Sequence, residues 1–245
     1  MSARGKLYGL GVGPGDPELL TVKALRILQA APVIAYPAPE QGPSLARAIV
    51  APHLDQPKEE IAIRMPLSAA RYPAPEIYRQ AAARIGAHLD RGRDVAVLCE
   101  GDPFFYGSFI YLFAELGQRY AVEVVPGVSS LTASAAALQT PLTARNDVLA
   151  VIPAPLPPAR IAAALRDADA AAIIKLGRHF AKVRQVLNEL GLAATARYIE
   201  RASMTAQRIL PLDQVRAETA PYFAIILVHR ADAAARLALG TAAIA

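Results

Sequence analysis

The sequence contains little cysteine, no tryptophan and no long apolar run. Its 245 residues include a single cysteine, Cys99, which excludes an internal disulfide. No uninterrupted apolar stretch reaches the roughly 18 residues of a membrane span. Residues 1–12, MSARGKLYGLGV, lack the charged, apolar and small-residue sections of a signal peptide. These absences predict a protein of the cytoplasm that makes no contact with a membrane.

A strong excess of one charge is also missing. The chain has 26 basic and 21 acidic side chains, a net charge of +5, and no run of five or six basic residues. Nucleic-acid binding is therefore not indicated, whereas a polyanionic small molecule or a plain solvated surface suits the small surplus. The spacings H-E-x-x-H and C-x-x-C do not occur, so no metal site is predicted.

What the sequence does contain is a regular alternation of strand and helix patterns. Strands are predicted at 6–12, 33–37, 61–67, 94–103 (a strand that runs into a turn), 122–127, 148–154, 170–177, 196–202, 207–212 and 221–230, and helices at 17–31, 44–54, 74–92, 106–117, 128–139, 158–168 and 180–191. This alternation is typical of an α/β protein with a mostly parallel sheet. The pattern restarts after Gly117, which predicts two α/β domains, 1–119 and 120–245.

The glycine-rich stretch GLGVGPGD (9–16) resembles a phosphate loop but lacks its spacing. It has neither the G-x-G-x-x-G of a dinucleotide site nor a terminal Gly-Lys-Ser/Thr. Asp16, Pro17 and Glu18 are predicted to be the N-cap and first residues of a helix, which places two carboxylates at the positive end of its dipole. A pyrophosphate would be repelled there, so the loop suits a neutral or cationic ligand. A capped turn without a ligand is the alternative.

Two further turns follow predicted strands, within CEGDPFFYGS (99–108) and VPGVSS (125–130). Gly101 permits a close approach of the backbone, and Ser129 and Ser130 offer hydroxyl groups at the start of a helix. Ligands of open α/β sheets bind beyond the carboxyl ends of the strands. The three turns together therefore predict one shared pocket.

The segments LGVGPGDPELLTVKA (10–24), GDP (101–103) and PGVSS (126–130), in this order, resemble the tetrapyrrole methylase family. The resemblance implies two α/β domains with S-adenosylmethionine in the active-site cleft between them, and a homodimer. Five further segments, LCEGDPFFYGSFIYLF, PLTARNDVLAVIPAPLP, IIKLGRHFAKVRQVL, RYIERASM and PYFAIILV, are similar to the branch that methylates precorrin-2 at carbon 20 in cobalamin biosynthesis. The implied substrate is an anionic tetrapyrrole, and the implied products are precorrin-3A and S-adenosylhomocysteine.

By the same resemblance, ten residues contact the cofactor: Pro14, Gly101, Asp102, Phe105, Ser129, Ser130, Leu176, Ala202, Ser203 and Ala224. Ala202 and Ser203 stand where the family commonly has Gly-Thr. Leu176 and Phe105 are residue types equally typical of a core, and Asp102 also suits a turn cap.

The implied reaction is an in-line displacement in which a nucleophilic ring carbon takes the methyl group, so the protein mainly positions the reactants. No catalytic residue is assigned, although Glu100 and Tyr106 flank the second turn. Candidates for binding the substrate's carboxylates are Arg64, Arg145, Arg178, His179 and Arg201. The alternatives are a cobalt-containing substrate, an RNA-modifying methylase of related fold, and a nucleotide-binding module without catalysis.

Overall fold

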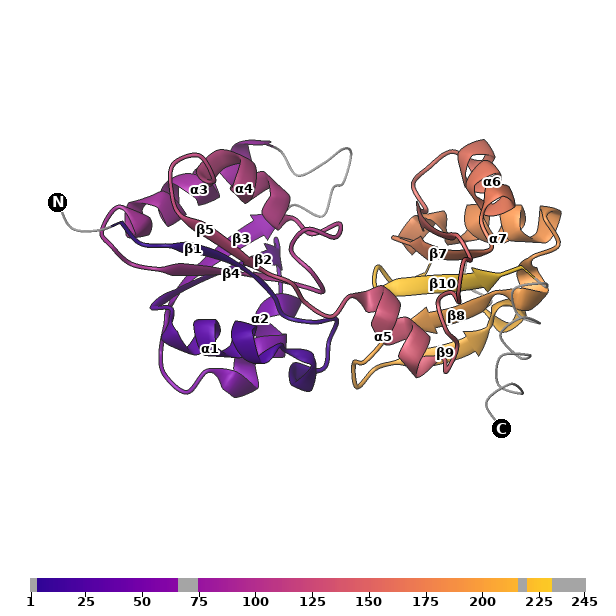
Figure 1. The fold of residues 1–245 in the computed structure, drawn as a ribbon, viewed down its shortest axis with the longest axis horizontal. Coiled ribbons are helices and arrows are strands. Elements are labelled where there is room, and N and C mark those ends of the chain that lie inside the picture. The colour runs from indigo at the N-terminus through magenta and orange to yellow at the C-terminus, as the bar shows by residue number, and fades with distance from the viewer. Residues whose placement is uncertain (1–3, 66–74, 216–219, 231–245) are drawn as a thin grey trace. The chain divides into compact units, whose positions relative to one another are not determined.

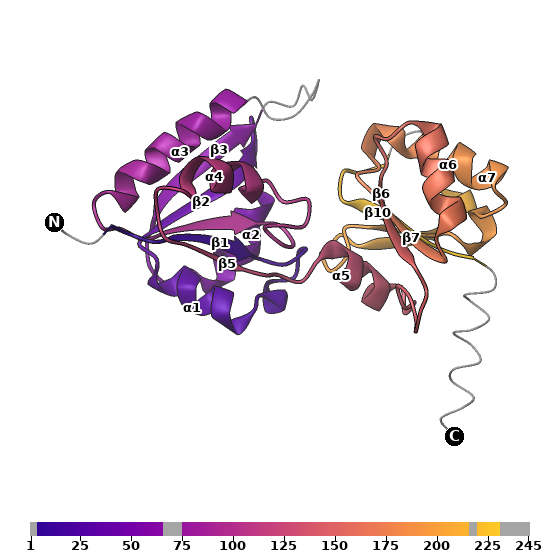
Figure 2. The same ribbon diagram turned by 45° about the horizontal axis from the view of Figure 1, so that its top comes forward.

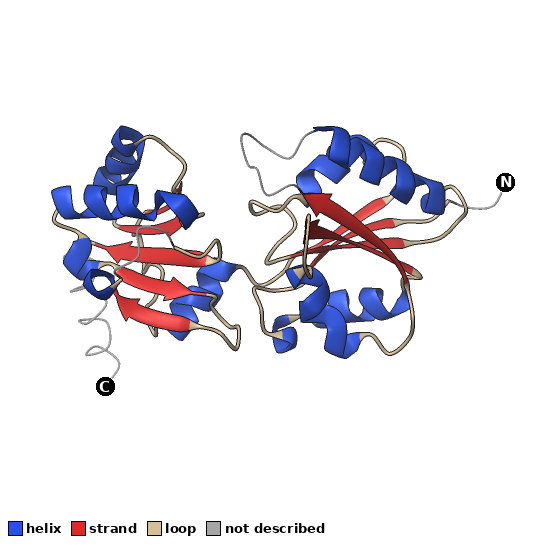
Figure 3. Cartoon of the chain, turned by 180° about the vertical axis from the view of Figure 1, so that it is seen from behind, coloured by secondary structure: helices blue, strands red, loops and turns tan. Residues whose placement is uncertain are grey.

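The computed structural model describes residues 4–65, 75–215 and 220–230. The chain divides into two compact units, Met1–Ser129 and Ser130–Ala245, each with its own sheet. The α/β class predicted from the sequence is confirmed for both units (Figure 3).

The first unit contains a five-stranded parallel sheet in the order β3-β2-β4-β1-β5. Its strands are β1 (Leu7–Gly11), β2 (Val33–Pro39), β3 (Glu59–Met65), β4 (Val95–Cys99) and β5 (Val122–Val125). Because all five run in the same direction, their carboxyl ends share one edge of the sheet. The turns after β1, β4 and β5 are adjacent there, since β4 and β5 flank β1.

Helices cover both faces of this sheet (Figure 1). They are α1 (Val22–Ala30), α2 (Leu45–Val50), α3 (Pro75–Leu89) and α4 (Phe109–Leu116). Alternate residues of β4 separate the two cores: Ala96 and Leu98 pack on the α1–α2 side, Val97 and Cys99 on the α3–α4 side. The strands are therefore almost continuously apolar, as expected for a sheet buried on both faces.

The first helix begins later than the sequence pattern predicts. Asp16 caps a short 3-10 turn, Pro17–Leu19, by accepting a hydrogen bond from the N–H of Glu18 at 2.8 Å. Thr21 is the N-cap of α1, its hydroxyl oxygen accepting from the N–H of Ala24 at 3.2 Å. The placement of Asp16 and Glu18 at the positive end of the α1 dipole is therefore wrong, because the 3-10 turn separates them from it.

The second unit has a mixed sheet in the order β6-β7-β10-β8-β9. Its elements are α5 (Ser130–Ala137), β6 (Leu149–Pro153), α6 (Pro158–Asp167), β7 (Ala170–Ile174), α7 (Phe180–Glu189), β8 (Arg197–Glu200), β9 (Arg208–Pro211) and β10 (Ala224–His229). In Figure 2, α6 and α7 lie on one face and α5 on the other. Each face carries a separate core, around Phe180 and Tyr198 on the α6–α7 side and around Leu131 and Ile199 on the α5 side.

β6 and β7 form the one parallel pair of neighbours among the described strands of the second sheet, whereas β10 is antiparallel to both β7 and β8. The expected mostly parallel arrangement thus holds for the first sheet. After α7 no α-helix connects the described strands, so β8 and β9 form an antiparallel pair. The first unit extends ten residues beyond the predicted boundary at 119/120, because β5 pairs with β1. The predicted domain limits, 1–119 and 120–245, stay a prediction.

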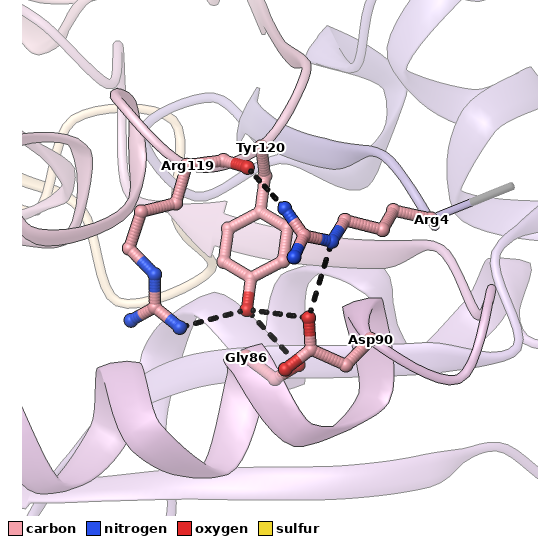
Figure 4. Close-up of polar contacts among 5 residues, drawn as sticks. All are labelled: Arg4, Gly86, Asp90, Arg119 and Tyr120. Atoms are coloured by element: carbon pink, nitrogen blue, oxygen red, sulfur yellow. Dashed lines mark hydrogen bonds and ion pairs between the residues drawn. The ribbon is translucent and has the colours of Figure 1, made fainter. Parts of the chain in front are cut away.

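A polar cluster at the end of α3 anchors the turn that leads into β5 (Figure 4). The buried Tyr120 hydroxyl donates to Asp90 at 3.1 Å and accepts from Arg119 at 3.2 Å. Arg4 forms an ion pair with Asp90 at 3.5 Å and donates to the carbonyl oxygen of Arg119 at 3.3 Å. Three segments of the first unit are joined in this way.

Within the described ranges, no helix combines the length and apolar character needed to cross a membrane.

Candidate functional site

The three turns at the carboxyl ends of β1, β4 and β5 meet through glycine. A Cβ atom placed on Gly11 would lie 2.5 Å from Gly127 Cα and 2.7 Å from the Gly101 carbonyl oxygen. A Cβ on Gly127 would overlap that same oxygen. The backbones of the three turns therefore touch directly, an approach that only glycine allows. The predicted convergence of these turns is present within the first unit.

Hydrogen bonds hold the turns in this arrangement. The N–H of Gly101 donates to the carbonyl oxygen of Gly13 at 2.8 Å, and both glycines have positive φ, 67° and 79°. Asp102 accepts from the N–H of Phe104 at 2.9 Å with one oxygen and from the N–H of Gly127 at 3.0 Å with the other. The Asp102 carboxylate thus joins the second turn to the third. Each of its oxygens has a further lone pair for a ligand.

The second turn presents a row of exposed aromatic side chains. Phe104, Phe105 and Tyr106 are 49%, 39% and 46% exposed. Tyr106 has a φ of +58°, a left-handed conformation that costs a non-glycine residue roughly 1–2 kcal/mol. Such strain is commonly retained at functional sites. Phe105 is therefore not a core residue, and its side chain is available to a ligand.

Glu100 is the last residue before the second turn. It is on the α1–α2 side of the sheet and accepts a hydrogen bond from the N–H of Ala46, in the first turn of α2, at 3.3 Å. Burial raises the pKa of the Glu100 carboxyl above its ordinary value. A carboxyl group in such a setting can hold or release a proton nearer to neutral pH than an exposed one.

The structure places five of the ten predicted cofactor residues in the first unit. Gly101, Asp102 and Phe105 belong to the second turn. Pro14 is buried beside Gly13, and Ser129 follows Gly127 by two residues. These five gather around the glycine contact. Their role toward a ligand stays a prediction.

The other five are in the second unit. Ser130 is the exposed first residue of α5. Leu176, Ala202 and Ala224 are buried, with 0%, 7% and 1% exposure. They are brought to one edge of the sheet, where the N–H of Arg201 donates to the carbonyl oxygen of Phe223 at 2.6 Å and Ala220 donates to Gly177 at 2.9 Å. Leu176, Ala202 and Ala224 are therefore core residues of the second unit, and their role toward a ligand stays a prediction.

The same edge contains three non-glycine residues with positive φ: Lys175 at 58°, Arg201 at 50° and Ser203 at 66°. Lys175 and Arg201 directly follow β7 and β8. Backbone conformation of this kind leaves no signal in a single sequence, because none of the three is glycine or asparagine. It marks this edge as a strained part of the second unit, along with Gln139 and Arg145, which also have positive φ.

The cations proposed for substrate carboxylates are scattered. Arg64 donates to the carbonyl oxygens of Pro39 and Glu40 at 3.0 and 3.4 Å, so its guanidinium is partly engaged. Burial and then the nearby Lys182 and Arg178 lower the pKa of His179, which disfavours its charged form. Arg145 belongs to the loop before β6 and is not at the strained edge. Arg178 and His179, in the 3-10 turn Gly177–His179 after β7, and Arg201, directly after β8, are at the strained edge. Their role toward a substrate stays a prediction.

The fold defines an α/β protein of two units, each built around its own five-stranded sheet. A solved structure with a similar fold, uroporphyrin-III C-methyltransferase from Thermus thermophilus with bound S-adenosylhomocysteine, matches 92% of this chain and 92% of its own with a TM-score of 0.65 and 27% identity. The sequence pattern of the Tetrapyrrole (Corrin/Porphyrin) Methylases matches residues 6–215. The chain belongs to this family, and the predicted resemblance is confirmed.

Three proteins with known names are similar to this chain in sequence. The cobalamin biosynthesis protein CobIJ of Mycobacterium tuberculosis is 44% identical over 93% of this chain, which spans only 46% of that protein. The precorrin-2 C(20)-methyltransferase of a Sinorhizobium species is 38% identical over 91% of this chain and 95% of its own length. The cobalt-precorrin-2 C(20)-methyltransferase of Salmonella typhimurium is 34% identical over 92% and 97%. The chain thus spans about half of the first relative and nearly all of the other two.

Proposed function

We propose that the protein is an S-adenosylmethionine-dependent methyltransferase that methylates precorrin-2 at carbon 20 and yields precorrin-3A. The observation that carries this proposal is the contact of Gly11, Gly101 and Gly127, closed by Asp102, in a chain of the tetrapyrrole methylase family. The similarity to the Sinorhizobium enzyme over nearly its full length supports the choice of substrate and ring position.

The residues of the first unit fit a sulfonium cofactor. A junction of three glycines lets backbone groups approach a ligand closely, and Asp102 supplies a carboxylate beside it. Pro14, Phe105 and Ser129 would complete this half of the cofactor site. Ser130, Leu176, Ala202, Ser203 and Ala224 would supply the half from the second unit, chiefly through their backbone. When bound, the cofactor supplies an electrophilic methyl group.

The chain's own residues then contribute positioning rather than covalent chemistry. Asp102 and the glycine junction fix the cofactor. The exposed Phe104, Phe105 and Tyr106 offer flat apolar surfaces to a macrocycle. Glu100, one residue before Gly101 and with a pKa raised by burial, is our candidate for the group that takes up the proton that the methylated carbon must lose.

Incubation of the purified protein with precorrin-2 and cofactor carrying a ¹³C-labelled methyl group tests the proposal. NMR of the product is expected to show the label at carbon 20. Parallel incubation with the cobalt-containing substrate measures which of the two has the higher kcat/KM, and a higher value for the cobalt complex would assign the chain to that alternative. Label at another ring carbon, or none on either tetrapyrrole, would overturn the proposal.

A homodimer in the cytoplasm belongs to the same proposal, supported by the family resemblance and by the composition. Light scattering after size-exclusion chromatography is expected to give twice the chain's 26.0 kDa mass.

A further inference from the structure

The strained edge of the second unit contains an unusual buried carboxylate. Glu200, the last residue of β8, is 5% exposed. One oxygen accepts a hydrogen bond from the Tyr198 hydroxyl at 2.8 Å. The other is buried and accepts no hydrogen bond from any residue that the structure describes. Leaving an ionised oxygen unsatisfied in this way is costly, so a compensating interaction is required.

Two arginines supply that compensation without forming hydrogen bonds to it. The unsatisfied Glu200 oxygen lies 3.6 Å from Arg201 Nη1 and 3.7 Å from Arg208 Nη1. Arg208 is directly opposite Glu200 in the β8–β9 pair. The arginine side chains are 38% and 61% exposed, whereas the Glu200 side chain is only 7% exposed. A buried anion thus holds two cations that face outward.

The cluster of Glu200, Arg201 and Arg208 has a net positive charge, and its guanidinium groups have N–H donors that are not used within the cluster. Two guanidinium groups face one carboxylate, and neither donates a hydrogen bond to another described side chain or carbonyl group. Arg201 is further fixed by its own backbone, with a φ of +50° and an N–H that donates to Phe223 at 2.6 Å. A guanidinium held in position with its N–H fork free matches the geometry of an external carboxylate.

We propose that Arg201 and Arg208, held in place by Glu200, form a carboxylate-binding site for the peripheral acetate and propionate groups of the substrate. The inference rests on the proposed function, because that function supplies a ligand with several carboxylates. Ala202 and Ser203, predicted to contact the cofactor, directly follow Arg201, which ties the site to the reaction. Glu200 is a positioning residue, and the two arginines contact the substrate.

Steady-state kinetics of Arg201→Gln and Arg208→Gln tests the site. Each substitution is expected to raise the KM for precorrin-2 about tenfold, a typical effect for one charge-assisted hydrogen bond, with KM for S-adenosylmethionine and kcat unchanged. Arg197→Gln is the matched control, because Arg197 is exposed at the other end of the same strand. If the KM for precorrin-2 in both variants stays within twofold of the value for Arg197→Gln, the inference is wrong.

Glu200→Gln tests the positioning role, since it keeps the side-chain volume and an acceptor for Tyr198. The expected result is a raised KM for precorrin-2 with an unchanged midpoint of thermal unfolding. An unchanged KM would remove Glu200 from the site.

A binding experiment separates this inference from the proposed function. The affinity of the protein for a porphyrin with eight carboxylates is measured by fluorescence quenching. The wild type is expected to bind it more tightly than a porphyrin with two carboxylates, and Arg201→Gln/Arg208→Gln to lose that preference. A retained preference in the double variant overturns the carboxylate site even if methylation is observed. Failure of the wild type to methylate any tetrapyrrole, with S-adenosylhomocysteine bound normally, would instead overturn the proposed function. If the double variant loses affinity for RNA but keeps its affinity for the porphyrin, the arginines bind phosphate groups and not carboxylates.

Discussion

At the scale of single residues, Asp102 has two tasks that a substitution can separate. Its two oxygens accept from Phe104 and Gly127, so it stabilises the turns, and in the proposed function it also contacts the cofactor. Asparagine keeps the volume but replaces one acceptor by a donor, which would point at an N–H group.

We therefore expect Asp102→Asn to weaken the binding of S-adenosylhomocysteine about tenfold or more, measured by calorimetry. Glu18→Gln, an exposed acid near the first turn, is the control and is expected to bind normally. Equal affinity of the Asp102 variant and the wild type would remove Asp102 from the cofactor site.

The glycine contact makes a second prediction at this scale. A Cβ on Gly11 would meet Gly127 Cα at 2.5 Å, so Gly11→Ala must push the first and third turns apart. We expect a loss of unfolding free energy of about 1–3 kcal/mol, measured in urea, together with loss of cofactor binding. Gly191→Asn is the control, because Gly191 has a φ of +67°, which asparagine tolerates, and open space around it. A stable Gly11→Ala protein with normal affinity would contradict the contact.

At the scale of elements, α3 and α4 are joined by a contact between a buried and a partly buried aromatic side chain. Tyr78 of α3 lies against Tyr111 of α4, with ring centroids 4.8 Å apart, and is 3% exposed. Burial raises the pKa of the Tyr78 hydroxyl from 10.0 to about 12.

A raised pKa in the folded state means that the neutral phenol is favoured there. The contribution of Tyr78 to the free energy of unfolding is therefore complete below pH 10 and is lost as the pH rises to about 12. Urea unfolding between pH 9 and 12 is expected to show a steeper loss of stability for the wild type than for Tyr78→Phe, by roughly 2 kcal/mol. Parallel curves for the two proteins would contradict the shift.

The predictability of the elements depends on how far each is decided by local pattern. The helices and strands were predictable because apolar residues recur at helical or strand spacing. The start of α1 was not, because Asp16 and Thr21 are both good N-caps and Pro17 suits the first turn of either helix type. Contacts that depend on strand order were also out of reach. The pairing of Glu200 with Arg208 requires the β8–β9 register, and the touching glycines require β4 and β5 to flank β1.

At the scale of the whole molecule, the sequence and the contacts divide the chain differently. The pattern of elements predicts a boundary at 119/120, and the contacts divide the chain after Ser129. A fragment 1–119 would lose β5 and the Asp102–Gly127 hydrogen bond, whereas 1–129 would keep both.

We expect the fragment 1–129 to unfold cooperatively in urea and the fragment 1–119 to be much less stable, as followed by circular dichroism. Because β5 is an edge strand that completes the sheet, its removal exposes apolar surface near Val125 and Leu10. Equal stability of the two fragments would favour the boundary predicted from the sequence.

The single thiol of the chain, Cys99, is at the end of β4, directly before Glu100 and the second turn. It is 3% exposed, and burial raises its pKa well above the ordinary value, so it is protected from alkylating reagents while β4 is in place. The Cys99 thiol of the wild-type protein can therefore report local unfolding around β4. The rate at which Ellman's reagent modifies this thiol would measure how often the first sheet opens locally. The rate could be compared with and without a bound ligand, and no engineered label would be needed.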